Sequence, residues 1–265
     1  MATGHTYAGK IVSKKLLTKS NREVKLTQEI NIHRSLNHKH IVDFQASFED
    51  GEFVYVVLEL CQKRSLLELH KRRNALTEPE TRYYMKQILD GVLYLHDNGI
   101  IHRDLKLSNL FLNDDMEMKI GDFGFATKIE YEGQRKNISN VAPEELNMKE
   151  FGLKIDVWSL GCIMYTLLVG KPPFETNSLR ETSERIKRCD YKIPTEIKAP
   201  AANLIYSMLL PDPKKRPTAE QIISSDFFND YIPSKLPVSC LTVAPRFDSK
   251  PWLKSIMEVK TVQLW

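Results

Sequence analysis

The chain has 265 residues, and 42% of them are hydrophobic, which is enough to bury the core of one domain of ordinary size. Its formal net charge of +4 is mild, and it contains no apolar run of about twenty residues, so we predict neither nucleic-acid nor membrane partners. Four scattered cysteines and no signal peptide indicate a reducing compartment without a zinc site, and we expect a protein of the cytoplasm or nucleus.

The first sixty residues have the pattern of strands with one helix among them. Residues 7–12 predict a short strand that carries Lys10, and Glu29 lies in a helix with periodic apolar side chains. Residues 53–60 form a continuous apolar run, which predicts a buried strand that leads into Cys61. A lysine in a strand is ordinarily exposed, so these residues gain a role only from the motifs that follow.

Two signals mark the middle of the chain. Residues 77–80 form a capping box with proline in the first turn, and apolar residues then recur at helical spacing up to Asn98-Gly99: Tyr84, Ile88, Val92 and Leu95. The turn residues 113–115 and an alternation over residues 116–120 predict a hairpin that leads to Asp122. The basic stretch 71–73 is predicted to lie on a solvated face.

The last third of the chain is predicted to be helical. A helix that is apolar on nearly every side begins at Asp156 and ends at Gly170, which places it in a core. Thr218 and Gln221 cap a final helix, which we expect to run toward residues 227–228. The chain shows no internal repeat.

The most specific motif is His102-Arg103-Asp104-Leu105-Lys106-Leu107-Ser108-Asn109-Leu110, followed by Asp122-Phe123-Gly124. This order is typical of the catalytic and metal-binding loops of protein kinases. Phosphoryl transfer depends on positioning and charge neutralisation, so Asp104 is expected to accept the proton of the attacking hydroxyl and Lys106 to neutralise the moving phosphoryl group. Asn109 and Asp122 offer the oxygen donors that Mg²⁺ prefers. His102 is expected to support the loop from a buried position.

The kinase order also assigns roles to residues outside these loops. Lys10 and Glu29 correspond to the ion pair that holds the α- and β-phosphates of ATP. Residues 59–61 correspond to the hinge, where the backbone of Glu59 and Cys61 would face adenine, with Leu58 guarding the pocket behind it. We expect Cys61 to be a small apolar lining residue and not a reactive thiol.

Three further residues are predicted to be structural. Ala142-Pro143-Glu144 closes the activation segment, and Arg216 is the expected partner of Glu144 in a buried ion pair. The alternative for Arg216 is a surface arginine before a helix. Asp156 stands at the start of the predicted core helix.

Several longer runs resemble those of one kinase family: residues 65–73, 76–80, 103–107 and 162–176. Through these runs the chain resembles the polo-like serine/threonine kinases, and the similarity extends from about Tyr7 to Phe247. The resemblance implies an α+β, two-lobed fold: a kinase domain at 1–230, with an incomplete antiparallel sheet lobe at 1–60 and a helical lobe at 61–230, and a C-terminal extension at 231–265. It also implies ATP and Mg²⁺ as cosubstrates, transfer to Ser/Thr in acidic surroundings, and a mitotic or centrosomal setting.

The chain departs from the polo-like pattern in four ways. Gly4 and Gly9 do not form the glycine-rich loop that covers the phosphates in relatives. The activation segment is shorter than in relatives, with Ser139 as a candidate replacement for the phosphorylated threonine. Ser108 replaces a glycine, and Phe125 follows the Asp-Phe-Gly motif. Residues 248–265 match no polo-box region.

Two function classes therefore remain open. The first is a serine/threonine kinase of reduced activity. In a variant of this class, the given sequence is an incomplete gene model, and the real protein has the missing start and the missing loop. The second is a pseudokinase that binds nucleotide or a partner protein without efficient transfer. The retained chemical residues favour the first, whereas the missing positioning loops favour the second. We expect a monomer, with self-association through the incomplete N-terminal lobe as the alternative.

Overall fold

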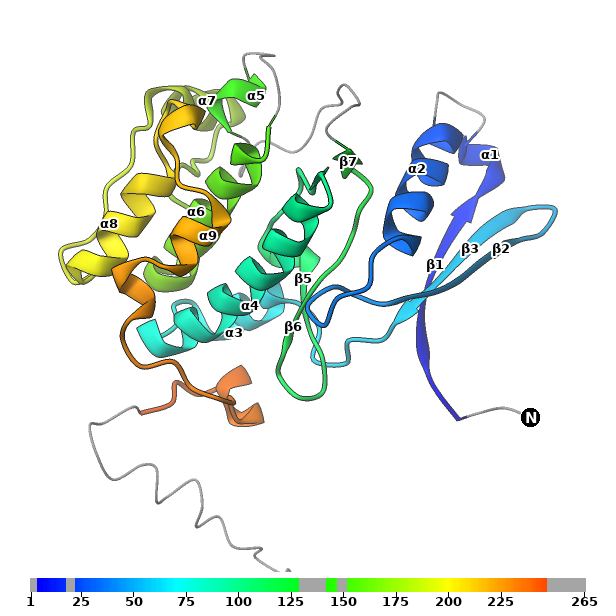
Figure 1. Cartoon of the computed structure of the whole chain (residues 1–265), viewed down its shortest axis with the longest axis horizontal. Helices are drawn as coiled ribbons and strands as arrows, with labels where there is room; N and C mark the ends of the chain where they lie inside the picture. Colours follow the sequence, from blue (N-terminus) through cyan, green and yellow to red (C-terminus); the bar gives the residue numbers. More distant parts are fainter. Residues whose placement is uncertain (1–3, 18–21, 129–141, 147–151, 247–265) are drawn as a thin grey trace, which may run out of the picture.

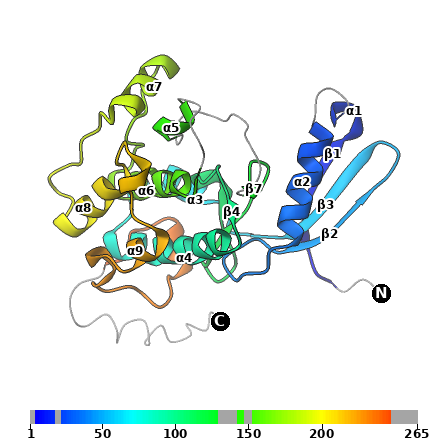
Figure 2. The ribbon, with the colours of Figure 1, turned by 45° about the horizontal axis from the view of Figure 1, so that its top comes forward.

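The computed structural model describes residues 4–17, 22–128, 142–146 and 152–246. The described chain forms two lobes, with the N-terminal strands on one side and most helices on the other (Figure 1). The second view shows the same separation, with the segments before β2 and after β3 joining the lobes (Figure 2). This arrangement confirms the prediction of a two-lobed α+β fold.

The N-terminal lobe consists of three antiparallel strands and two helices. These are β1 (Tyr7–Ser13), α1 (Lys14–Leu17), α2 (Arg22–Arg34), β2 (Phe44–Glu49) and β3 (Phe53–Glu59), with the strands in the order β1-β3-β2. In β1 the even-numbered residues 8, 10 and 12 are half-buried, whereas residues 7, 9 and 11 are exposed. Because strand side chains alternate between faces, Lys10 lies on the protected face of the sheet, opposite Val56 of β3.

The C-terminal lobe is mainly helical. Its helices are α3 (Leu66–Arg73), α4 (Glu78–Asp97), α5 (Pro143–Leu146), α6 (Lys154–Val169), α7 (Leu179–Arg188), α8 (Ala199–Met208) and α9 (Ala219–Ile223). Short 3₁₀ turns lie at Leu107–Asn109, Pro213–Lys215, Asp226–Phe228 and Val238–Leu241. Two small antiparallel pairs, β4 (Ile100–Ile101) with β7 (Thr127–Lys128) and β5 (Leu110–Leu112) with β6 (Met118–Ile120), carry the loops of the site.

The local signals in the sequence place the helix ends. The predicted capping box opens α4, with Thr77 accepting from the Glu80 amide, and a second box of Thr218 and Gln221 opens α9. Gly170 ends α6 in the left-handed conformation, at φ 84°. As predicted, α6 lies in the core, because every residue from Ile155 to Leu168 is buried.

Four details of the predicted elements are wrong. The strand before the hinge ends at Glu59, and Leu60 is exposed. Met116 is buried in the hairpin turn and not in the strand, since its φ is 65°. The core helix begins at Lys154, two residues before Asp156. The last helix ends at Ile223, and residues 226–228 form a separate 3₁₀ turn.

The prediction that residues 71–73 lie on a solvated face is also wrong for Arg73. Its guanidinium makes two hydrogen bonds of 2.9 Å to Glu80, and the exposed fractions of the two side chains are 4% and 0%. Arg73 also donates to the backbone carbonyls of Cys240 and Val243, at 2.5 and 3.1 Å. Helix α3 thus holds the segment after the last helix against the C-terminal lobe.

A second buried arginine holds the start of the same segment. Arg82 donates to the Phe227 carbonyl at 2.6 Å and to the Asp230 carboxylate at 2.9 Å. Leu236 and Cys240 are buried, so the segment packs as part of the lobe as far as Cys240, whereas residues 242–244 are exposed. Within those residues, no helix combines the length and apolar character needed to span a bilayer.

Candidate active site

The loop after β4 is held by hydrogen bonds to a buried carboxylate. Asp156 of α6 is fully buried and accepts hydrogen bonds from the amides of His102 and Arg103, at 2.9 and 2.8 Å, and from His96 at 3.0 Å. Burial alone would raise the pKa of Asp156, but these donors outweigh it and the pKa is lowered. Arg103 has a φ of 62°, which a non-glycine residue rarely adopts. Asp156 thus stabilises an unusual backbone conformation directly before Asp104.

His102 lies inside this loop with no exposed surface, in the position expected of a support. Its Nδ1 accepts from the Asp104 amide at 3.2 Å, and its Nε2 donates to the Gly121 carbonyl at 3.1 Å. The two contacts join the catalytic loop to the residue before Asp122.

Asp104, Lys106 and Asn109 lie together in the structure. The Lys106 Nζ lies 2.8 Å from the Asp104 Oδ2, and the Asn109 Nδ2 donates to the same oxygen and to the Asp104 carbonyl, both at 2.9 Å. A carboxylate held by two donors points in a defined direction, which a general base requires. The Lys106 side chain is 35% exposed, so its ammonium can also reach an entering phosphate.

Asp122 is placed beside this group by the β5–β6 hairpin. The amide of Gly121 donates to the Asn109 carbonyl at 2.9 Å, which brings the two predicted metal-binding segments into contact. Asp122 is exposed and has a φ of 62°. A Cβ atom added at Gly124 would lie 3.3 Å from both the Asp122 Oδ1 and the Glu29 Oε2. The missing side chain of Gly124 therefore allows α2 to approach the Asp122 loop.

Lys10 and Glu29 form the predicted contact across the N-terminal lobe. The Lys10 Nζ lies 2.5 Å from the Glu29 Oε1, and the lysine side chain keeps an exposed fraction of 40%. Strand β1 and helix α2 position the two residues, so the cation is oriented and still accessible.

Lys10, Glu29 and Asp122 line one pocket of about 480 Å³ between the lobes, whereas Asp104, Lys106 and Asn109 are not among its lining residues. Residues 58–61 form its hinge side, and Glu59 among them is a further charged lining residue. Cys61 is half-buried, and burial raises the pKa of its thiol to about 12, which agrees with an unreactive lining residue. The lining combines apolar and charged side chains, as a nucleotide site requires.

The donor set fits Mg²⁺ that is shared with a phosphate. Among the described residues no group of three or more His, Cys, Asp or Glu side chains could hold a metal. Mg²⁺ commonly takes only one or two protein ligands and completes its shell with phosphate oxygens and water. Asn109 and Asp122 would hold the ion in this way, and it would supply positive charge that neutralises the phosphates of ATP.

His33 also lines the pocket, although no motif in the sequence predicts it there. Its ring lies 4.6 Å from the Phe123 ring, and its Nε2 hydrogen bonds to the Val42 carbonyl at 2.7 Å. His33 follows Glu29 by four residues, so helical spacing alone could have placed both on one face.

Glu144 and Arg216 form the predicted buried pair. Arg216 makes two hydrogen bonds to the Glu144 carboxylate, at 2.6 and 2.8 Å, and its guanidinium lies 4.8 Å from the centre of the Trp158 ring.

Ser108 lies in the loop between Asp104 and Asn109, with its hydroxyl 3.3 Å from the Asn109 Oδ1. Ser139 lies outside the described residues.

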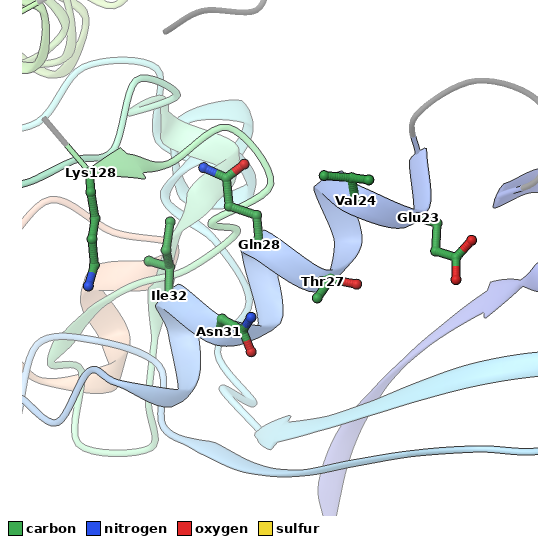
Figure 3. A pocket seen from close by; sticks show the side chains of 7 residues that line it. All are labelled: Glu23, Val24, Thr27, Gln28, Asn31, Ile32 and Lys128. Carbon is green, nitrogen blue, oxygen red and sulfur yellow. The ribbon is translucent and has the colours of Figure 1, made fainter. Parts of the chain in front are cut away.

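A larger hollow, of about 600 Å³, contains none of the predicted site residues. It runs along α2 and is lined by Glu23, Val24, Thr27, Gln28, Asn31, Ile32 and Lys128 (Figure 3). Its lining carries no arrangement of acid, base and oriented nucleophile, so size does not identify the reactive site in this molecule.

Comparison with known proteins agrees with the geometry. The family profile described as "Protein kinase domain" matches residues 1–228. The chain belongs to the protein kinase family. It is 59% identical over 251 residues to serine/threonine-protein kinase PLK1 of Xenopus laevis, covering 92% of this chain and 42% of that protein.

Two other relatives give the same assignment. The chain is 53% identical over 264 residues to serine/threonine-protein kinase polo of Drosophila melanogaster, covering 97% of this chain and 46% of that protein. It is 52% identical over 251 residues to plk-1 of Caenorhabditis elegans, covering 93% and 39%. These matches confirm the resemblance to polo-like kinases. The chain spans less than half the length of these relatives.

Proposed function

We propose that this chain is the catalytic region of a polo-like kinase and transfers the γ-phosphoryl group of ATP to serine or threonine hydroxyls of proteins. The observation that carries the proposal is the convergence of two separate units on one pocket. The Lys10–Glu29 pair lines this pocket from the N-terminal lobe, and Asp122 lines it from the C-terminal lobe. The Asp104–Lys106–Asn109 group is joined to the Asp122 segment by the hydrogen bond from the Gly121 amide to the Asn109 carbonyl.

Each of these residues has one role in phosphoryl transfer. Lys10, oriented by Glu29, would bind the α- and β-phosphates, and the hinge backbone at Glu59 and Cys61 would hydrogen bond adenine. Asp104 would accept the proton of the substrate hydroxyl as its oxygen attacks phosphorus. Lys106 would then move its charge from Asp104 toward the phosphoryl group in transfer.

The finer assignments rest on similarity to the polo-like kinases. These assignments place the kinase domain at 1–230 and name protein substrates with Ser/Thr in acidic surroundings. They also include a monomeric state and a cytoplasmic or nuclear setting linked to cell division. Lys106 at this loop position supports Ser/Thr as the acceptor. The pseudokinase alternative gains no support from the relatives, which are named as kinases.

A paired binding and transfer measurement tests the proposal. The unmodified chain should bind Mg-ADP and label an acidic Ser/Thr peptide from radioactive ATP. Asp104→Asn should keep the Mg-ADP affinity and lose about 10² to 10⁴ of the transfer rate, because it removes the base and leaves the pocket. Binding with no transfer above the Asp104→Asn background would favour the pseudokinase. No Mg-ADP binding at all would refute the kinase proposal and leave a pseudokinase that binds a partner protein.

A further inference from the structure

The side chain of the hinge residue Glu59 makes a contact that the kinase motifs do not assign. Glu59, the last residue of β3, directs its Oε2 toward two donors: the Lys119 Nζ at 3.0 Å and the Asp43 amide at 3.1 Å. The amide of Glu59 itself donates to the Asp43 carbonyl at 2.9 Å. The exposed fractions are 24% for the Glu59 side chain and 13% for that of Lys119, so water screens this pair less than the surface pairs.

Lys119 belongs to the strand that positions the metal-binding loop. It is the middle residue of β6, three residues before Asp122, and it pairs with Phe111 of β5, which lines the nucleotide pocket. Lys119 itself is not among the lining residues. Glu59 does line the pocket, so the ion pair joins the hinge at the pocket wall to the strand that leads to Asp122.

The backbone around β6 is already tied to the N-terminal lobe. Ile120 accepts from the Val42 amide at 2.9 Å and donates to the His40 carbonyl at 2.8 Å. The chain after the hinge is tied to β5, because the Lys63 amide donates to the Leu112 carbonyl at 3.2 Å and the Leu112 amide donates to the Arg64 carbonyl at 2.8 Å. Glu59 lies in the chain between these two attachments. Glu59 bonds to both sides of the junction, Asp43 on one and Lys119 on the other.

We propose that Glu59 and Lys119 are positioning residues that hold the hinge at a fixed distance from Asp122, so that adenine and the metal-bound phosphates of one nucleotide can be bound at the same time. The inference rests on the proposed nucleotide site. It gives the Glu59 side chain a role separate from the backbone role in binding adenine.

A double-mutant cycle on nucleotide affinity tests this role. The variants are Glu59→Gln, which keeps an acceptor for the Asp43 amide, Lys119→Met, and the double variant, each measured for Mg-ADP affinity by calorimetry and for thermal unfolding. Each single variant should raise the Mg-ADP Kd by about three- to tenfold, and the double variant should lose no more than either single one. Lys119→Arg should restore most of the affinity, because it keeps the charge.

The chain offers a matched control on the same hairpin. Lys63 and Asp114 also join the hinge region to the β5–β6 turn, but at 3.6 Å and with exposed fractions of 28% and 57%. Lys63→Met should leave the Mg-ADP Kd within about twofold of the unmodified chain. Equal Kd values in all variants, or losses of affinity that only follow losses of unfolding temperature, would overturn the inference. A failure of the unmodified chain to bind Mg-ADP would instead overturn the proposed function and the inference together.

Discussion

The two lobes each contain an ion pair that the kinase motifs predict, and the two pairs differ in their burial. In the C-terminal lobe, Arg216 and Glu144 have side-chain exposed fractions of 0% and 6%. In the N-terminal lobe, Lys10 and Glu29 have fractions of 40% and 14%. A fully buried pair is costly to break, whereas a partly exposed pair can exchange its partner for water or for a ligand. The first is suited to hold the fold, and the second to hold a nucleotide.

The apolar core of the N-terminal lobe is also smaller and less buried than that of the C-terminal lobe. The large hydrophobic cluster includes all of the apolar side chains of α6 but not the buried Leu17, Leu26 and Val56 of the N-terminal lobe. The N-terminal lobe also exposes large side chains, namely Tyr7, Ile11, Leu16, Val24 and Phe48. We therefore expect the N-terminal lobe to open at a lower free energy than the C-terminal lobe.

The largest effect is expected from the buried pair of the C-terminal lobe. Arg216→Ala leaves the Glu144 carboxylate buried without its cation and removes the guanidinium from the Trp158 ring. The free energy of unfolding should fall by about 3 to 5 kcal/mol, measured by urea titration. Lys215→Ala, an exposed neighbour, should change it by less than about 0.5 kcal/mol. An equal effect of the two substitutions would remove the distinction between the pairs.

An intermediate effect is expected from acid at the junction of the lobes. Burial, the largest cause, lowers the pKa of both His33 and His40 below the ordinary value of 6.5, although each ring has a hydrogen bond to a backbone carbonyl that opposes the shift. The unfolded chain therefore takes up these protons first as the pH falls. The stability due to the neutral rings is complete above pH 6.5 and is lost as the pH falls through the lower folded pKa values.

A variant isolates this contribution for His33. Glutamine at position 33 keeps a donor for the Val42 carbonyl but does not titrate. The loss of unfolding free energy between about pH 7.5 and about pH 5.5 should be smaller in His33→Gln than in the unmodified chain. Identical pH dependence in both proteins would show that His33 does not link proton uptake to unfolding.

The sequence predicted those parts of the site that depend on local pattern or on motif spacing. The capping box at Thr77 and the left-handed end at Gly170 are local signals, and the Lys10–Glu29 and Glu144–Arg216 contacts follow from the order of kinase motifs. The prediction of a solvated Arg73 is wrong, because its neighbours are basic and the carbonyls that it binds lie 167 and 170 residues away in the sequence. The spacing of α3 does place Arg73 on the face of the buried Leu66 and Leu69, seven and four residues before it, but the spacing does not reveal the partners that bury the guanidinium.

The Glu59–Lys119 contact was missed for a related reason. Lys119 alternates with apolar residues in a hairpin, which is the pattern of an exposed strand position, and its partner belongs to the other lobe. The placement of a side chain at a junction between lobes depends on how the lobes meet. That information is absent from the pattern of either segment alone.

The smallest effect on stability, and the sharpest on binding, is expected from the pair in the N-terminal lobe. Lys10→Met should change the free energy of unfolding by less than about 1 kcal/mol, because the lysine side chain is partly exposed. Ligand binding raises apparent stability by RT ln(1 + [L]/Kd), so millimolar Mg-ADP should raise the unfolding temperature of the unmodified chain and have little effect on Lys10→Met.

Lys14→Met provides the matched control for this last measurement. Lys14 forms a pair with Glu49 at 3.3 Å in the same lobe, but it does not line the nucleotide pocket. The Mg-ADP shift should therefore remain in Lys14→Met. If both variants lost the shift, the cause would be a general weakening of the N-terminal lobe and not the loss of a phosphate-binding cation. If both kept it, Lys10 would have no part in nucleotide binding, and the contrast between a pair that holds the fold and a pair that holds the ligand would fail.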